Sequence, residues 1–157
     1  MQYLMKQKLF SLLADDFIIK DEAERDVFIV AGKGFSNDLH FNDLSGKEIA
    51  SIVEDTVPWE STFNIYKGEA LWAVVQKKLF TLFKSKFAID VFGQEAILAE
   101  GDFSDHEYVF TRAGKPIAHV SKEWFTFVDT YGVDVDQQDD AVLILASTVI
   151  IDMCETD

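Results

Sequence analysis

Basic residues, cysteine and proline are all scarce in this sequence. The 157 residues include 14 Lys and Arg against 28 Asp and Glu, which gives a formal charge of −14. A surface this acidic repels phosphate backbones, so the composition argues against nucleic-acid binding. Cys154 is the one cysteine. A single cysteine excludes an internal disulfide and a cysteine-ligated zinc site.

Targeting and membrane-spanning patterns are missing as well. The opening residues, MQYLMKQKLFSLL, lack the apolar stretch and the small-residue cleavage site of a secretory signal. No apolar run reaches the roughly 18 residues that a membrane-spanning helix requires. These observations predict a cytoplasmic protein without a transmembrane segment. The 48% of hydrophobic residues argues against disorder, and we expect one domain over residues 1–157.

The sequence does contain an internal repeat. Residues 6–21, KQKLFSLLADDFIIKD, align with residues 76–91, QKKLFTLFKSKFAIDV, and residues 35–54 align with residues 103–122. Twelve of the 36 aligned positions are identical, and the two matches follow in the same order. The repeat predicts two halves of similar structure, over about residues 3–66 and 70–130.

Short strands joined by polar turns recur within each half. Val, Ile, Phe, Thr and Tyr are frequent, and several segments alternate apolar and polar residues, as strands with one buried face do. Consecutive hairpins remove their exposed edges by closing into a barrel. We therefore expect a closed antiparallel barrel of about twelve strands, six in each half. The predicted strands are 3–12, 17–20, 26–30, 38–43, 48–54, 61–66, 70–83, 87–91, 96–100, 107–111, 116–122 and 125–130.

The segment AVLILASTVII, residues 141–151, is apolar except for Ser147 and Thr148. Its length favours a helix over a strand, and a helix that is apolar on all sides is a buried helix. Asp139 and Asp140 precede it, where acidic residues complement a helix N-terminus. A barrel of about twelve strands is too wide to be filled by its own side chains. The sequence thus predicts a mainly β fold, in which the barrel surrounds a C-terminal helix over about residues 139–154.

Several segments also carry a family resemblance. MKQKLFSL, KKLFTLFKSKFAIDV, EGDFSDHEYVFTR, SKEWFTFVDTYGVDV and DDAVLILASTVIIDM follow one another in the chain. Together they resemble the bacterial YxjI-like branch of the LURP-one-related family. The resemblance covers nearly the whole chain and implies the tubby C-terminal-like fold, but no established activity. Tubby proteins bind phosphoinositides through basic side chains, and no residue of this sequence is assigned to those positions.

The best candidate binding surface lies in residues 70–89. This segment contains Lys77, Lys78, Lys84 and Lys86, with Phe83 among them, and no acidic residue. Lysine and aromatic side chains together suit an anionic head group and its apolar neighbour. We interpret the segment as a weak binding site for anionic ligands or phospholipid head groups. The alternative is a strand pair whose lysines are only solvated or protect an edge.

A second candidate lies in the stretch that contains Asp102, Asp105, His106 and Glu107. These residue types bind metal ions or act as acid–base groups. Their spacing matches no standard metal motif, so a polar connection between strands is the simpler interpretation. No nucleophile-elbow, dinucleotide-binding or phosphate-binding motif is present, so no cofactor is expected.

These patterns favour a non-enzymatic binding or scaffold protein whose partner is an anionic lipid head group or a protein. Two alternatives stay open. One is an enzyme with an acidic and histidine site at the mouth of the barrel, and the other is a protein–protein interaction module.

Overall fold

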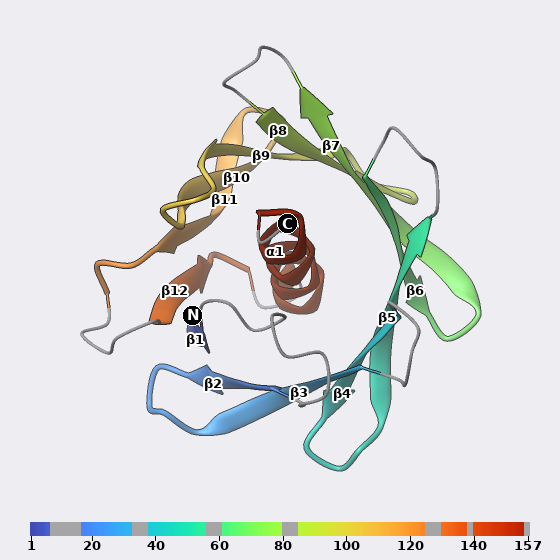
Figure 1. Ribbon diagram of the computed structural model, residues 1–157, viewed down its shortest axis with the longest axis vertical. Coiled ribbons are helices and arrows are strands. Elements are labelled where there is room, and N and C mark those ends of the chain that lie inside the picture. Colours follow the sequence, from blue (N-terminus) through green and yellow to red (C-terminus); the bar gives the residue numbers. More distant parts are fainter. Residues whose placement is uncertain are drawn as a thin grey trace.

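The computed structural model describes residues 1–6, 17–32, 38–55, 61–79, 85–124, 130–137 and 140–155. Within these ranges twelve strands form a wall and one helix occupies its centre (Figure 1). The strands are β1 (Gln2–Lys6), β2 (Phe17–Asp21), β3 (Asp26–Gly32), β4 (Leu39–Asp43), β5 (Glu48–Asp55), β6 (Thr62–Lys67), β7 (Ala70–Leu79), β8 (Ser85–Val91), β9 (Ile97–Asp102), β10 (Glu107–Arg112), β11 (Lys115–Ser121) and β12 (Thr130–Val135), and the helix is α1 (Ala141–Glu155).

The twelve strands close into a barrel in which each strand pairs with its neighbours in the sequence. Closure is made by β1, which pairs antiparallel with both β12 and β2 and places Leu4 opposite Gly132. Apolar residues alternate along the strands, so that one face of each packs on the core. This arrangement confirms the predicted closed antiparallel barrel. Six strands fall in each half of the repeat, β1–β6 and β7–β12.

The helix α1 runs through the centre of the barrel (Figure 1) and confirms the predicted buried helix. Leu145, in its middle, has no exposed surface. The hydroxyl groups of Ser147 and Thr148 donate to the carbonyl oxygens four residues earlier, at 2.8 Å in both cases. Their polar groups are therefore satisfied within the helix, which lets them lie in an apolar core. No helix among the described residues has the length and apolar character to cross a membrane.

The last predicted strand, residues 125–130, falls outside the described ranges except for Thr130. The described strand β12 runs from Thr130 to Val135, beyond that prediction. Gly132 and Asp134 are residue types that favour loops. In the structure Gly132 is buried opposite β1, and the Asp134 carboxylate lies 3.4 Å from the N-terminal amine. Pairing with β1 outweighs the local preference of these two residues.

The turns after β2 and β4 share one hydrogen-bond pattern. Asp21 accepts the backbone N–H groups of Ala23 and Arg25, and Asp43 accepts those of Ser45 and Lys47. Three residues after each aspartate the backbone takes a positive φ, which is 61° at Glu24 and 88° at Gly46. Glycine adopts this conformation at little cost, whereas glutamate does not.

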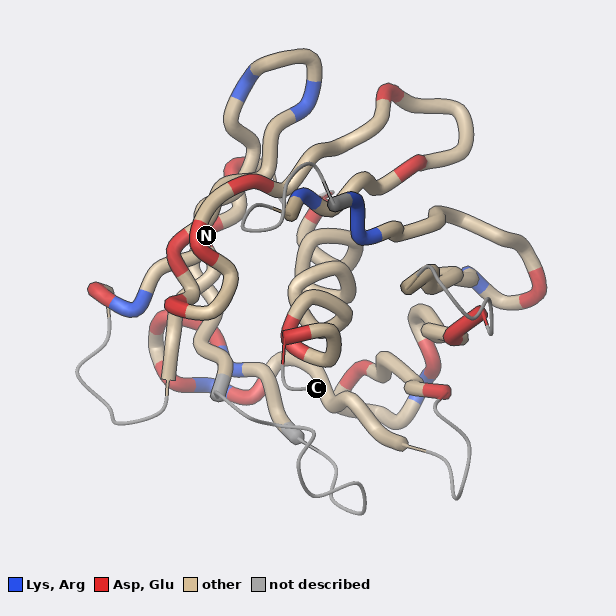
Figure 2. Tube along the Cα trace, turned by 45° about the horizontal axis from the view of Figure 1, so that its top comes forward, with Lys and Arg blue, Asp and Glu red and all other residues tan. Residues whose placement is uncertain are grey.

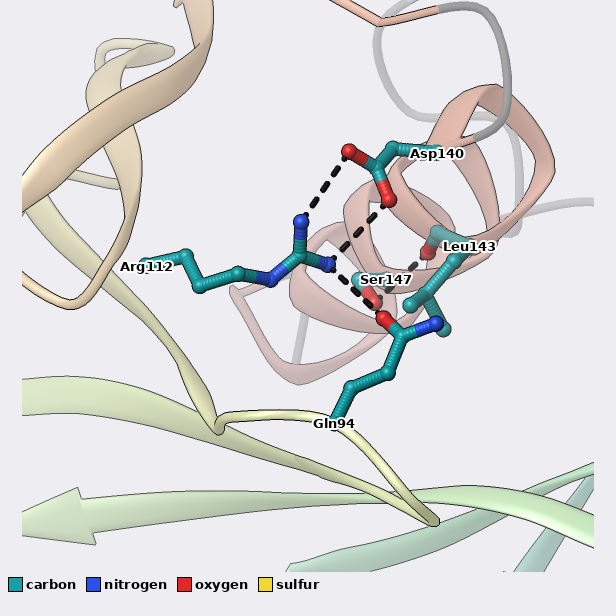
Figure 3. Close-up of polar contacts among 5 residues, drawn as sticks. All are labelled: Gln94, Arg112, Asp140, Leu143 and Ser147. Carbon is teal, nitrogen blue, oxygen red and sulfur yellow. Dashed lines mark hydrogen bonds and ion pairs between the residues drawn. The ribbon is translucent and has the colours of Figure 1, made fainter.

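Arg112, at the end of β10, fixes the N-terminal end of α1 to the barrel wall (Figure 3). Its two terminal nitrogens donate to the two carboxylate oxygens of Asp140, at 3.2 and 3.1 Å, and one of them also donates to Gln94 at 3.2 Å. Such a two-point contact sets the orientation of both groups. Asp140, expected to complement the helix N-terminus, thus binds the wall. Asp139 lies outside the described residues.

Candidate functional site

A buried polar cluster lies at the end of the barrel that surrounds the C-terminal end of α1. We call it the mouth cluster, and its members are His106, Tyr108, Tyr131 and Asp152. The His106 Nε2 atom lies 2.9 Å from Asp152 Oδ1, and the Tyr131 hydroxyl donates to Asp152 Oδ2. The imidazole also stacks on the Tyr131 ring, with the ring centres 4.3 Å apart. Asp152 is only 3% exposed, so this carboxylate relies on protein donors in place of water.

The turn between β9 and β10 places His106 inside the barrel. Asp102 accepts hydrogen bonds from the Ser104 hydroxyl at 2.9 Å and from the Asp105 N–H at 3.1 Å. The His106 N–H donates to the Phe103 carbonyl at 3.3 Å, and His106 takes a φ of 54°. This left-handed conformation is uncommon outside glycine, although histidine adopts it more often than most residues. The turn therefore keeps its carboxylates exposed and directs the imidazole to the helix.

Tyr108 makes no comparable contact with a charged group. Its buried hydroxyl makes no well-formed hydrogen bond among the described residues, although the nearby Thr148 hydroxyl lowers the pKa of Tyr108 and so opposes part of the rise that burial causes. Burial raises the pKa of both Tyr108 and Tyr131 well above the ordinary value, and the negative charge of Asp152 raises both further. Both phenols therefore stay neutral at physiological pH, and Tyr131 keeps the proton that it donates to Asp152.

Two acidic residues occupy the last turn of α1, where the helix dipole disfavours negative charge. Each has a compensating contact with the barrel wall. Asp152 accepts from His106 and Tyr131, and the Glu155 carboxylate lies 3.2 Å from the ammonium group of Lys77 on β7. These contacts hold the C-terminal end of the helix to the strands around it.

The chemistry available to the mouth cluster follows from the second imidazole nitrogen. With Asp152 as the acceptor, Nε2 carries a proton, and Nδ1 is left as the atom that exchanges protons with a substrate. Nδ1 is buried and has no hydrogen-bond partner among the described residues. The cluster therefore fastens α1 to the wall and presents no imidazole nitrogen to solvent.

The candidate lysines lie at the same end of the barrel but on different faces of its wall. Lys78 and Lys86 are directly opposite each other across β7 and β8. The ammonium group of Lys77 instead lies beside Glu155 and 5.9 Å from the centre of the Phe87 ring. Phe83 and Lys84 lie outside the described residues.

The segment that carries these lysines is free of acidic residues along the chain but not in space. Glu155 reaches Lys77 from the helix, and Glu100 on β9 lies 3.2 Å from the Lys86 ammonium group. Figure 2 shows acidic positions on turns and strands around the whole barrel, with fewer basic positions between them. The positive charge at this end is thus partly balanced by the acidic protein that surrounds it.

Comparison with protein families agrees with this architecture. A family model described as LURP-one-related matches residues 1–152. The chain belongs to the LURP-one-related family. The uncharacterized protein YxjI of Bacillus subtilis (strain 168) is 31% identical over 154 residues, which are 97% of this chain and 92% of that protein. An X-ray structure of an Arabidopsis thaliana protein shares the fold with a TM-score of 0.69 and 12% identity, over 98% of this chain and 90% of that one.

In this LURP-one-related protein the residues considered for a metal site point in different directions. Asp102 binds its own turn, His106 lies inside the barrel, and Glu107 accepts the Ser121 hydroxyl at 2.7 Å. Asp105 is exposed. In the described part of the chain, no three or more His, Cys, Asp and Glu side chains lie close enough together to hold a metal ion.

Sequence reasoning missed three of the four members of this LURP-one-related protein's mouth cluster. His106 was a candidate, but Tyr108, Tyr131 and Asp152 were not. One signal was present, because Asp152 directly follows the apolar run of α1 and an ionisable residue beside a buried segment needs a partner. The partners themselves come from β10, from β12 and from the turn before β10. Only the closed barrel brings them together.

Proposed function

We propose that this protein acts by binding an anionic phosphate group, as carried by a phospholipid head group, and not by catalysis. The observation that carries the proposal is the direct opposition of Lys78 and Lys86 across β7 and β8. Directly opposite side chains have Cβ atoms about 5 Å apart, and like charges at such positions destabilise a sheet. An anion held between the two ammonium groups removes this repulsion. The lysine pair therefore favours an anionic ligand.

The expected affinity is low. A lysine near an anionic membrane surface contributes about 1 kcal/mol to the binding free energy, so the pair contributes about 2 kcal/mol. This free energy corresponds to binding weaker than a millimolar dissociation constant. Glu100 balances part of the charge of Lys86, and the formal charge of −14 opposes the approach of any anion. At physiological salt, charges more than about 8 Å away are screened. We therefore expect weak, salt-sensitive binding. The proposal also takes the protein to be cytoplasmic, where it meets the anionic inner leaflet of the cell membrane.

The test is co-sedimentation with vesicles that contain phosphatidylserine, against vesicles of phosphatidylcholine alone. We expect binding to the anionic vesicles at low salt, a decrease at physiological salt, and no binding to the neutral vesicles. The double variant Lys78→Gln with Lys86→Gln removes the binding. The matched control is Lys67→Gln with Lys115→Gln, which changes the net charge equally at two exposed residues, the last of β6 and the first of β11, and retains most of the binding.

Two outcomes contradict the proposal. Absence of binding at low salt removes the lipid function and favours a protein partner instead. Equal loss in the two double variants shows that only net charge matters. Inorganic phosphate at about 100 mM, compared with sodium chloride at the same ionic strength, separates the two sources of the ligand. Stronger competition by phosphate indicates recognition of the phosphate group itself, and equal effects of the two salts indicate a response to the membrane field.

One observation favours a second candidate function, acid–base catalysis at the mouth of the barrel. Asp152 holds the His106 ring as a carboxylate orients a catalytic histidine. This function ranks second because a substrate must reach His106 Nδ1, which is buried. Hydrolysis of p-nitrophenyl acetate above background that is lost in His106→Ala would favour catalysis over binding.

A further inference from the structure

We propose that the anion site prefers a phosphate group with a neighbouring primary ammonium group, as ethanolamine and serine phospholipids carry, and that Glu100 binds this ammonium group. The inference rests on the proposed function above and names the class of head group. Lys78 lies opposite Lys86 across β7 and β8, and the Lys86 ammonium group lies 3.2 Å from Glu100 Oε1. A negative charge thus follows two positive charges across the neighbouring strands β7, β8 and β9.

The three side chains share the outer face of the barrel wall. Phe87 follows Lys86 in β8 and lies opposite Ala99 of β9, and both Phe87 and Ala99 are fully buried. Side chains alternate between the two faces of a strand, so Lys86 and Glu100, which adjoin this buried pair, point outwards. Their side chains are 36% and 47% exposed, and Lys78 is exposed as well. A ligand in solution therefore has access to all three charged groups.

The carboxylate of Glu100 disfavours a ligand that is only an anion. Across β9 and β10 the uncharged Val109 lies opposite Glu100, so the counter-charge that the strand register brings to Glu100 is Lys86. An anion that binds Lys86 takes this counter-charge and lies close to the carboxylate, and like charges repel each other. A ligand that also carries a cation gives Glu100 a new partner. The exchange costs little, because a partly exposed ion pair contributes little to stability.

The spacing of the charges suits a head group with both signs of charge. A phosphate group on Lys86 and an ammonium group on Glu100 are separated by about one strand spacing, about 4.8 Å. In ethanolamine phosphate one oxygen and two carbon atoms separate the phosphorus from the nitrogen, which is a comparable span. A primary ammonium group donates hydrogen bonds to a carboxylate, whereas the trimethylated nitrogen of choline has no proton to donate. The site therefore distinguishes ethanolamine and serine head groups from choline and glycerol head groups.

The first experiment compares vesicles of the same net charge at low salt, which contain either phosphatidylserine or phosphatidylglycerol. Only phosphatidylserine has an ammonium group, and we expect the wild type to bind it about threefold more tightly. In Glu100→Gln this preference is expected to disappear, because binding to phosphatidylglycerol rises and the partner of the ammonium group is lost. The matched control is Glu95→Gln, which removes the same charge from the exposed turn between β8 and β9 and keeps the threefold preference.

The second experiment separates the head group from the membrane. Ethanolamine phosphate and choline phosphate are added at equal concentration and ionic strength as soluble competitors against phosphatidylserine vesicles. We expect stronger competition by ethanolamine phosphate, and equal competition in Glu100→Gln. Thermal unfolding of each variant shows that the fold is retained.

The outcomes separate this inference from the proposed function. Equal binding of the wild type to the two kinds of vesicle, equal competition by the two soluble phosphates, or an unchanged preference in Glu100→Gln overturns the role of Glu100 and leaves the proposed function in place. Absence of binding to either kind of anionic vesicle overturns the proposed function itself.

Discussion

Tyr131 and Tyr108 are both buried in the mouth cluster, and among the described residues only the Tyr131 hydroxyl of the two donates to a carboxylate. Replacing each by phenylalanine removes one oxygen atom and leaves the aromatic ring in place. In Tyr131→Phe the carboxylate of Asp152, which is 3% exposed, loses a donor and gains no water to replace it. A hydrogen bond to a charged group contributes about 1.5–3 kcal/mol, and we expect a loss of that size in the free energy of unfolding.

In Tyr108→Phe the lost hydroxyl is one that makes no well-formed hydrogen bond among the described residues. Its removal takes away a desolvation penalty along with the oxygen, so the free energy of unfolding is expected to change by less than about 1 kcal/mol. For a chain of this length about 1 kcal/mol shifts the melting temperature by about 2–4 °C. Tyr131→Phe is therefore expected to melt about 3–12 °C below the wild type, and Tyr108→Phe within a few degrees of it.

Urea unfolding followed by tryptophan fluorescence and far-UV circular dichroism measures the difference. Equal slopes of free energy against urea in the three proteins are required, because only then do the midpoints compare stabilities. Similar losses in both variants would refute the reasoning, since they would show that burial of either phenol matters and the contact with Asp152 does not. A neutral result for Tyr131→Phe would refute it as well.

Two further predictions concern backbone strain and alkaline pH. Glu24→Gly is expected to raise the free energy of unfolding by about 0.5–1 kcal/mol, because Glu24 has a φ of 61° that glycine adopts at less cost. Gly46 takes the matching turn position with a φ of 88°, so Gly46→Ala is expected to lower the free energy of unfolding by about 1 kcal/mol. A loss of stability in Glu24→Gly contradicts the argument. The pKa of Tyr108 and of Tyr131 is raised in the folded protein. Their contribution to the free energy of unfolding is therefore complete below about pH 10, the ordinary tyrosine pKa, and is lost as the pH rises above it. Urea midpoints that stay constant well above about pH 10 would contradict the raised pKa of the two phenols.

Much of the fold was accessible from the sequence because its signals are local. Alternation of apolar and polar residues predicted the strands. Gly46 and Gly114 indicated turns at matching places of the repeat, and both have a positive φ in the structure, 88° and 78°. The uniform apolar character of α1 predicted its burial. Residues 131–135 were not predicted as strand because β12 depends on a partner at the other end of the chain, where Tyr131 lies opposite Met5. No local preference reports such a contact.

Less of the candidate site could be predicted from the sequence, because its contacts join segments that are far apart in the chain. His106 and Asp152 are 46 residues apart, and Lys77 and Glu155 are 78 residues apart. Composition identified Lys77 as part of a basic segment, but its neighbour Glu155 comes from the helix. The opposition of Lys78 and Lys86 depends on the register of one hairpin, and a shift by one residue would turn each side chain to the other face.

The pairing of β1 with β12 also determines when the barrel can close. Gln2 lies opposite Asp134, so the ring stays open until the residues of β12 have been synthesised. The helix that fills the ring follows β12 in the sequence, and its Arg112–Asp140 contact sets it in place only after most strands exist. Pairings between distant residues slow folding and leave apolar strand faces uncovered meanwhile. Each newly made chain thus passes through a period in which its inner face is exposed and prone to aggregation.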